Sequence, residues 1–186
     1  MLDILAYIVI PIYTILFAWD TDWFTTNFSV IGNMSHKNND FLLWGLLIGL
    51  YFYLSLRRIL KCVPRNKKET ILVTSAGVLL LFAVTTPYLP GQFPFRSFLH
   101  VIFAFCASVL LLASIYFIVW KLYLRQKEVY RPYLTALFCS TAICAVLLVI
   151  AGIVSSALEI YFTIFCSVLV RKLDKRLLRG QVSGPF

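Results

Sequence analysis

Long apolar runs, rather than a regular alternation of apolar and polar residues, dominate this 186-residue chain. A helix needs about 20 largely apolar residues to cross a bilayer, whereas a membrane barrel is built from alternating strands of about 10 residues. The continuous runs favour helices. The pattern predicts an all-α polytopic membrane helix bundle with six transmembrane helices, at about residues 3–19, 41–56, 71–89, 98–122, 133–150 and 155–170.

The last two predicted helices share one apolar stretch, residues 132–170, which is too long for a single ordinary span. Its small, flexible segment at residues 151–156 (Ala-Gly-Ile-Val-Ser-Ser) predicts a turn without a long loop. The other loops leave no room for a soluble domain of normal size. We therefore expect residues 1–186 to form a single transmembrane domain.

Composition agrees with this architecture. The chain is 61% hydrophobic and 13% charged, whereas soluble domains contain about 45–50% apolar and about 25% charged residues. So much apolar material also excludes a disordered chain. An integral membrane protein is the class that remains.

Basic residues are divided unevenly between the two sides of the predicted bundle. Six lie between the second and third helices, four between the fourth and fifth, and five after the sixth: Arg57, Arg58, Lys61, Arg65, Lys67, Lys68; Lys121, Arg125, Lys127, Arg131; Arg171, Lys172, Lys175, Arg176 and Arg179. The opposite loops contain only Lys37 and Arg96. Because cytoplasmic loops are enriched in Lys and Arg, both termini are predicted to be cytoplasmic.

The net charge of +9 is therefore interpreted as a basic collar close to the membrane, which favours contact with anionic lipid headgroups. No nucleic-acid-binding motif occurs, so we expect no nucleic-acid partner. The five Cys and two His residues lack the spacing of zinc ligands, and phosphate-binding glycine motifs are absent. We therefore expect no metal site and no cofactor.

Polar residues gather on the predicted extracytoplasmic side, at the outer leaflet. Ionisable groups at membrane depth are costly and for that reason are candidates for function, and His100 and Glu159 are the two found in the outer parts of predicted helices. The first outer loop and the second add further polar groups. The candidate ligand-binding residues are Asp20, Asp22, Asn33, His36, Arg96 and Glu159, and the candidate catalytic residues are His100, Ser29 and Thr26.

Each candidate also has a purely structural interpretation. His100 is also explained by a hydrogen bond to a neighbouring helix or to interfacial water. Glu159 is also explained by an ion pair with Arg96 or by a place in the headgroup region. Asp20 and Asp22 flank tryptophans in the manner of solvated acids beside an aromatic belt.

A Gly-x-x-x-Gly pattern at Gly45 and Gly49 predicts close approach of two helices. The partner helix belongs either to the same chain or to a second copy in a homo-oligomer.

Four short motifs carry a resemblance to a known family: Asn-Phe-Ser-Val-Ile-Gly-Asn at 27–33, a Gly-rich segment at 41–49, Thr-Thr-Pro-Tyr at 85–88, and His100. Together they resemble the domain-of-unknown-function 998 family of prokaryotic membrane proteins with six to seven spans. Its recurring positions match Ser29, Gly32, Pro87 and His100, over about residues 1–125. The resemblance implies a helical protein of a prokaryotic plasma membrane, and it implies no activity.

The arrangement is also loosely similar to two eukaryotic groups. One is the Frag1/DRAM/Sfk1 proteins, which are linked to lipid organisation. The other is the FAR-17a-like fatty-acid ester hydrolases, which use an intramembrane Thr and His. This second similarity implies that Thr26 or Ser29 pairs with His100, although Thr26 falls in a predicted loop rather than in a helix.

Three functions fit the sequence. The first is binding of a membrane lipid or lipophilic ligand at the outer polar and aromatic rim. The second is an intramembrane lipid-ester hydrolase, in which His100 activates Ser29 or Thr26 and the imidazole is oriented by an acid from the set Asp20, Asp22 and Glu159. The third is a small transporter or channel lined by Glu159 and His100. A His100 ring more than about 6 Å from both hydroxyls would oppose the second function.

Overall fold

The computed structural model describes residues 1–34 and 37–182, with side chains as far as Arg179. Within these ranges the chain forms helices and turns and contains no β-strand. The helices are α1 (Leu2–Ile4), the π-helical turn η1 (Leu5–Val9), α2 (Ile10–Ala18), α3 (Phe28–Gly32), α4 (Asn38–Leu60), α5 (Lys67–Thr85), α6 (Pro94–Arg125), α7 (Lys127–Ala151) and α8 (Ser156–Val182).

The first three elements form one continuous helix, Leu2–Ala18. Its π-helical turn lies directly before Pro11. Because proline has no backbone N–H and its ring crowds the preceding turn, the helix widens there instead of breaking, which is a common use of a single π turn.

Turn-forming residues set the ends of two other predicted helices. The expected turn at 151–156 is confirmed, since α7 ends at Ala151 and Gly152 takes the left-handed conformation with φ of 68°. The third helix ends at Thr85 rather than near residue 89. Pro87 explains this difference, because the residue before a proline is pushed away from helical geometry.

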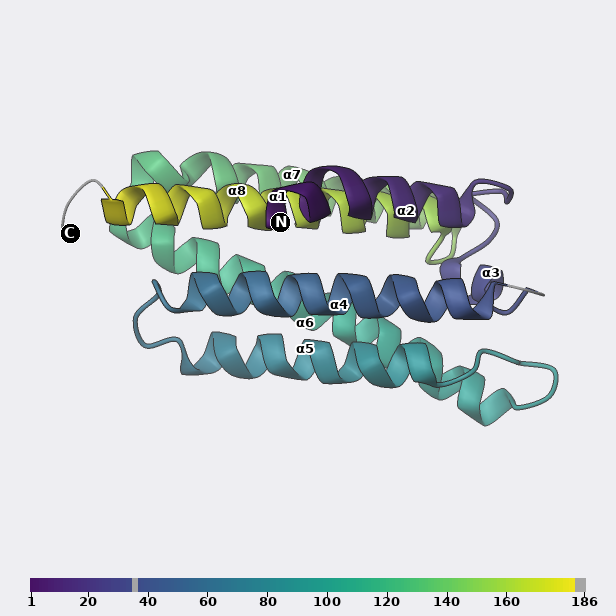
Figure 1. The fold of residues 1–186 in the computed structure, drawn as a ribbon. Coiled ribbons are helices and arrows are strands. Elements are labelled where there is room, and N and C mark those ends of the chain that lie inside the picture. Colours follow the sequence, from purple (N-terminus) through teal and green to yellow (C-terminus); the bar gives the residue numbers. More distant parts are fainter. Residues whose placement is uncertain (35–36, 183–186) are drawn as a thin grey trace.

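The helices form two groups joined by one diagonal helix (Figure 1). Helices α4 and α5 lie side by side in one group, and α2, α7 and α8 lie together in the other. Helix α6 crosses diagonally behind α4 and α5 and connects them to α7. Helix α6 therefore connects the two groups, which also contact each other directly where α4 packs against α8 and α2.

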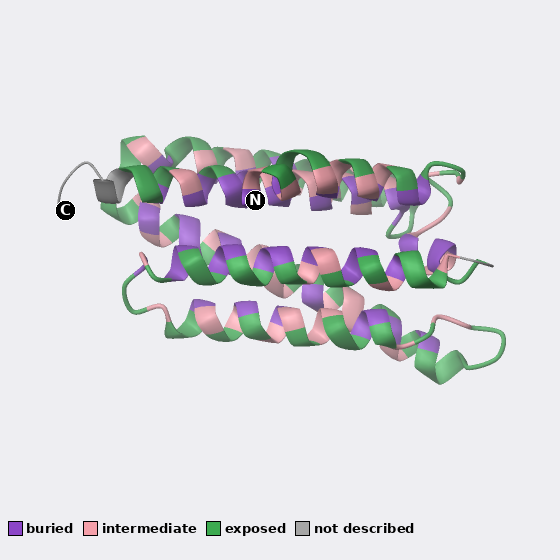
Figure 2. Ribbon diagram, viewed as in Figure 1, coloured by how far each residue is buried: buried purple, intermediate pink, exposed green. Residues whose placement is uncertain are grey.

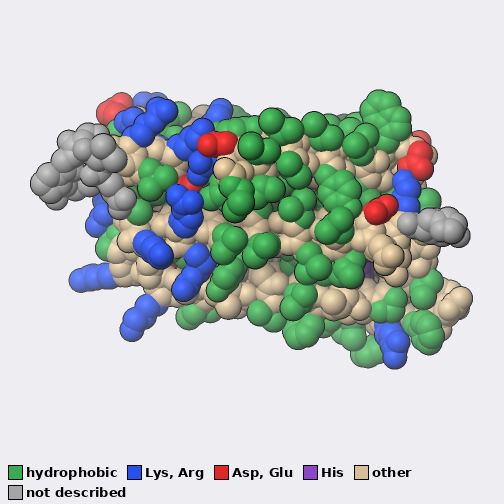
Figure 3. Space-filling view, viewed as in Figure 1, with side chains coloured by type: hydrophobic (Ala, Val, Ile, Leu, Met, Phe, Trp, Pro, Cys, Tyr) green, Lys and Arg blue, Asp and Glu red, His purple; other side chains and the backbone are tan. Residues whose placement is uncertain are grey.

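Four helices, α4, α5, α6 and α7, are long and apolar enough to cross a membrane. Within their apolar segments only 17% to 44% of the residues are buried, so much of the apolar surface faces outward (Figure 2). The space-filling view shows an apolar middle with most Lys and Arg side chains at one end (Figure 3). These features are those of an integral membrane protein. Leu2–Ala18 is a shorter apolar helix, and α8 combines an apolar half with a basic one.

Part of the predicted basic collar is an ion-pair network rather than a solvated rim. The Arg171 guanidinium donates to both carboxylate oxygens of Asp3, at 2.9 and 3.1 Å, and to Asp174 at 2.5 Å. Asp174 is 2% exposed. A second pair joins Lys121 and the buried Glu69 at 2.6 Å. These contacts fasten the first helix and α5 to their neighbours at the cation-rich end.

The glycine pattern on α4 is used within the chain. A Cβ added at Gly45 would lie 2.2 Å from Val84 Cγ1, and one added at Gly49 would lie 3.1 Å from Leu80 Cδ2. Both neighbours belong to α5. The intramolecular alternative of the two predicted uses is therefore the one realised on this face.

Candidate functional site

A short helix in the first outer loop, which was not predicted, positions the candidate site. Helix α3 begins after Asn27, whose side-chain oxygen accepts a hydrogen bond from the Val30 amide at 2.9 Å. This is the usual role of Asn before a first helical turn. The Glu159 carboxylate of α8 accepts a second first-turn hydrogen bond, from the Phe28 amide at 2.7 Å. The two contacts give α3 a fixed direction.

Aromatic packing holds α3 against the bundle. Phe28 is fully buried, and its ring meets Phe17 at 5.1 Å and Trp44 at 4.8 Å between centroids, both edge to face. At the other end of α3, a Cβ added at Gly32 would lie 2.6 Å from Phe41 Cγ. Only glycine therefore allows α3 to approach α4 this closely.

Ser29 and His100 are brought together by this arrangement. Ser29 Oγ lies 2.6 Å from His100 Nε2, although 71 residues separate them in the chain. His100 lies in the second turn of α6 and is only 1% exposed. Ser29 thus lies within the distance of about 6 Å from the His100 ring that a hydrolase requires.

The second nitrogen of the imidazole defines its protonation. His100 Nδ1 lies 2.8 Å from the backbone oxygen of Thr86. A carbonyl oxygen only accepts hydrogen bonds, so these partners assign the proton to Nδ1 and make Nε2 the acceptor of the Ser29 hydroxyl proton. The orienting group is therefore the Thr86 carbonyl, and the expectation that Asp20, Asp22 or Glu159 orients His100 is wrong.

Glu159 has a different partner from the one considered in the sequence. It binds the Phe28 amide rather than Arg96, and the exposed guanidinium of Arg96 lies over the Phe93 ring, 5.1 Å from its centroid. Glu159 is partly accessible and lines an interhelical cavity.

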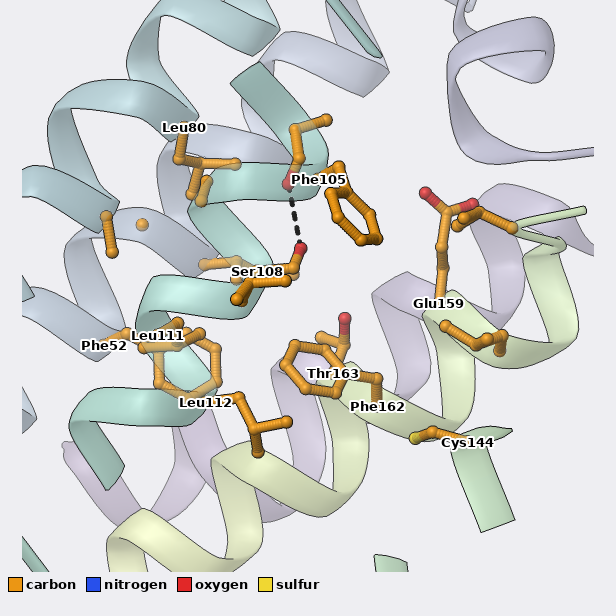
Figure 4. A pocket seen from close by; sticks show the side chains of 18 of the residues that line it. Phe52, Leu80, Phe105, Ser108, Leu111, Leu112, Cys144, Glu159, Phe162 and Thr163 are labelled. Atoms are coloured by element: carbon orange, nitrogen blue, oxygen red, sulfur yellow. Dashed lines mark hydrogen bonds between the residues drawn. The ribbon is translucent and has the colours of Figure 1, made fainter. Parts of the chain in front are cut away.

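This cavity has a volume of about 450 Å³ and lies between α4, α5, α6, α7 and α8. Its walls are mostly aliphatic and aromatic side chains, and Asn27, Ser29 and Glu159 form a polar end. Figure 4 shows Phe105 and Ser108 of α6 across the space from Glu159 and Thr163 of α8. The candidate Ser29–His100 pair therefore stands beside an apolar space large enough for a small ligand.

The cavity is only partly enclosed, and exposed lining residues on α6 and α7 indicate an opening between these two helices. The two helices are joined at Gln126 and contact each other where the Tyr116 and Thr141 hydroxyls hydrogen-bond at 2.7 Å. Farther from the joint both helices line the cavity, and there Phe105 of α6 is 56% exposed and Leu148 of α7 is 40% exposed. A lateral opening of this kind faces lipid when the bundle stands in a membrane.

The other candidate residues lie apart from the Ser29–His100 pair or serve the loop. The Thr26 hydroxyl donates to the Asp22 carbonyl, and the Thr26 carbonyl accepts from the Ser156 amide at 2.7 Å. The Asp22 side chain accepts from the Phe24 amide at 2.8 Å and closes a turn. Asn33 is the exposed C-cap of α3, and His36 lies outside the described residues.

Asp20 forms an exposed ion pair with Lys37. The hydrogen-bonded Lys37 ammonium lowers the pKa of the Asp20 carboxyl below its ordinary value. Because Lys37 also donates to the Phe17 carbonyl at 3.2 Å, this pair ties the two ends of the first outer loop together.

Two residues that shape the candidate site were not predicted from the sequence, Asn27 and Thr86. Asn27 belongs to the motif at residues 27–33, and Asn before a short apolar run is a recognisable signal for the start of a helix. Thr86 acts through its backbone oxygen, which no side-chain pattern reports. Among the described residues no group of three or more His, Cys, Asp or Glu converges in a way that could hold a metal ion.

Comparison with known proteins finds no relative of this chain. No protein-family model, no curated protein and no solved structure matches the chain.

Proposed function

We propose that the protein is a six-span membrane protein, with both termini cytoplasmic, that binds the apolar chain of a lipid in the cavity between its helices. The observation that carries this proposal is the cavity itself, which is apolar along its length, polar at the Asn27–Ser29–Glu159 end and open sideways. An amphiphile entering from the bilayer would keep its chain among apolar walls and its head at the polar end.

The length of the cavity suits one lipid chain. Its wall on α4 runs from Trp44 to Leu56, which corresponds to about 18 Å at the rise of an α-helix. One leaflet contributes about 15 Å of hydrocarbon to a bilayer core of about 30 Å. The polar end lies away from the cation-rich end, and under the positive-inside rule this supports access from the outer leaflet.

Co-purification tests this function. We expect mass spectrometry of the protein, purified in a mild detergent, to find a chain-bearing lipid at near-stoichiometric amounts. Gly77→Phe should displace it, because Gly77 lines the cavity and an added Cβ there has no neighbour closer than 4.0 Å. Ala142→Phe is the matched control, since Ala142 is an exposed residue of α7 outside the lining. Equal lipid content in both variants would refute cavity binding.

A second candidate function is hydrolysis of a lipid ester, and the Ser29–His100 hydrogen bond favours it. With its proton on Nδ1, the imidazole has Nε2 directed at the Ser29 hydroxyl, the geometry of a general base and its nucleophile. Asn27 also lines the cavity, and because its oxygen accepts from Val30, its side-chain NH₂ stays available to stabilise an oxyanion. The lateral opening favours a lipid ester over a transported solute.

The reaction would proceed in two balanced steps. Ser29 Oγ attacks the ester carbonyl while its proton passes to His100 Nε2, and the alcohol leaves with that proton. Water then attacks the acyl-serine, His100 takes a proton from the water and returns it to Ser29 Oγ as the acid is released. The net change is one ester and one water converted to one acid and one alcohol.

A fluorophosphonate probe distinguishes hydrolysis from binding alone. The hydrolase hypothesis expects covalent labelling of the wild-type protein that is lost in Ser29→Ala and His100→Ala. Thr26→Ala should retain labelling, because the Thr26 hydroxyl is bonded to the Asp22 carbonyl. Monodisperse wild-type protein that binds lipid but takes up no probe would leave binding as the function and exclude an activated Ser29.

A further inference from the structure

Glu159 gives the polar end of the cavity its chemical character. Among the described residues that line the cavity, Glu159 is the single Asp or Glu, and none is Lys, Arg or His. The remaining polar lining groups are hydroxyls, a thiol, the Asn27 amide and the Trp44 indole, whose N–H donates to Thr14. A ligand head at this end therefore meets acceptors and a carboxylate rather than cations.

The hydrogen-bonding state of Glu159 leaves room for a ligand. Oε2 accepts from the Phe28 amide at 2.7 Å, while Oε1 has no hydrogen-bond partner within the described part of the chain. Because a carboxylate oxygen accepts more than one hydrogen bond, Glu159 offers an acceptor toward the cavity while its other oxygen holds α3.

Within the described ranges, the Lys, Arg and His side chains at the α3 end of the bundle are engaged elsewhere. Lys37 is paired with Asp20, Arg96 is exposed over Phe93, and His100 uses both ring nitrogens on Ser29 and Thr86. Among the residues that the structure describes, no Lys, Arg or His therefore lines the polar end to neutralise a phosphate or carboxylate.

From this geometry we infer that the ligand is a single-chain amphiphile with an amine head, whose ammonium group binds Glu159 while its chain fills the cavity. The inference rests on the proposed binding function and makes it specific. A charge-assisted hydrogen bond between an ammonium group and a carboxylate is among the stronger polar contacts. The same carboxylate disfavours anionic heads, because two negative charges would lie side by side without a counter-ion.

Competition in a lipid environment tests this inference. The protein in phosphatidylcholine nanodiscs is labelled by a photoreactive, alkyne-bearing hexadecylamine, and unlabelled hexadecylamine, hexadecanol and hexadecanoic acid compete for the site. We expect the amine to compete about tenfold more effectively than the alcohol, and the acid to compete least.

Two Gln variants separate the carboxylate from general charge effects. Glu159→Gln keeps an oxygen for the Phe28 amide but removes the charge, and it should abolish the preference for the amine over the alcohol. Glu128→Gln makes the same change at an exposed position at the start of α7, and it should leave the preference intact.

The possible outcomes are distinguishable. Equal competition by amine and acid in the wild type, or a preference for the amine that persists in Glu159→Gln, would overturn the amine inference while chain binding stands. Labelling that does not saturate, and that Gly77→Phe does not reduce, would instead overturn cavity binding itself.

Discussion

The ionisable side chains at the two ends of the bundle have different kinds of partner. At the cation-rich end, Arg171 is shared by Asp3 and Asp174, and Glu69 is paired with Lys121. At the α3 end, Glu159 and His100 have no charged partner within the described part of the chain, and they bind backbone groups and a hydroxyl instead. The first end pairs the acids Asp3, Asp174 and Glu69 with cations, whereas Glu159 at the second end lines a cavity.

This difference separates structural roles from candidate functional ones. In a buried ion pair, each charge offsets part of the cost of burying the other, so a structural role is enough to explain why both are present. A single titratable group beside an apolar cavity has no such explanation within the fold and is a stronger candidate for ligand binding or catalysis. The following experiments compare the two ends directly.

Removing Arg171 should have the largest effect on stability. Arg171→Ala leaves Asp174, which is 2% exposed, with only the more distant Arg58 at 3.8 Å. Loss of one partner from a buried pair costs about 3–5 kcal/mol. Unfolding in mixed micelles with increasing SDS measures the change in free energy. Arg176→Ala, at an exposed position on the same helix, should cost little, and similar losses in both variants would contradict a structural role for the network.

Packing of α4 against α5 should show the next largest effect. Gly45→Ala places a Cβ 2.2 Å from Val84, and overpacking of this kind costs about 1–3 kcal/mol. The matched variant Gly77→Ala meets nothing closer than 4.0 Å, so the higher helix propensity of alanine should leave it at least as stable as the wild type. The same SDS titration compares the two, and a stable Gly45→Ala protein would show that α4 and α5 are not in this register.

The α3 end should be less important for stability than for chemistry. Ser29→Ala removes one hydrogen bond, which is worth about 1 kcal/mol, yet it should eliminate fluorophosphonate labelling if Ser29 is the nucleophile. Measuring unfolding and labelling on the same preparation tests this contrast. A stability loss as large as that of Arg171→Ala would instead mark the Ser29–His100 contact as a structural clamp.

The smallest effect is expected at the Asp20–Lys37 pair, which is exposed and screened by solvent. Lys37 lowers the pKa of Asp20 in the folded protein. The stabilisation by this pair is therefore fully present above the pKa that Asp20 has in the unfolded chain, and it disappears as the pH falls through the lower pKa that Asp20 has in the folded protein. The melting temperature of Asp20→Asn should thus lie slightly below that of the wild type at neutral pH and match it in strong acid. A gap that widens on acidification would contradict this sign.

Hydropathy and turn residues predicted the helices well because both are local properties. Gly152 marked the last turn correctly, and the predicted apolar segments all fall within or close to helices. The extensions beyond them, such as α8 continuing past Val170, involve polar residues that continue a helix outside its apolar part. Hydropathy does not report such residues.

The candidate site was only partly predictable, since contacts between distant segments decide it. The sequence placed Ser29 and Thr26 on equal terms as partners of His100. The choice between them depends on α3, which is fixed by Phe28 packing and by Glu159 from the far end of the chain. Likewise, nothing local indicated that Arg171 turns toward Asp3, which lies 168 residues away in the sequence.

The Glu159–Phe28 hydrogen bond joins residues that lie 131 positions apart, and this separation has a consequence for biosynthesis. During synthesis of the chain, α3 emerges early, but the carboxylate that holds its first turn arrives only with the last helix. A nascent chain that ends before α8 lacks one wall of the cavity and its single acidic residue. The pocket is therefore completed last, so that lipid meets a finished site only after the whole bundle has been inserted.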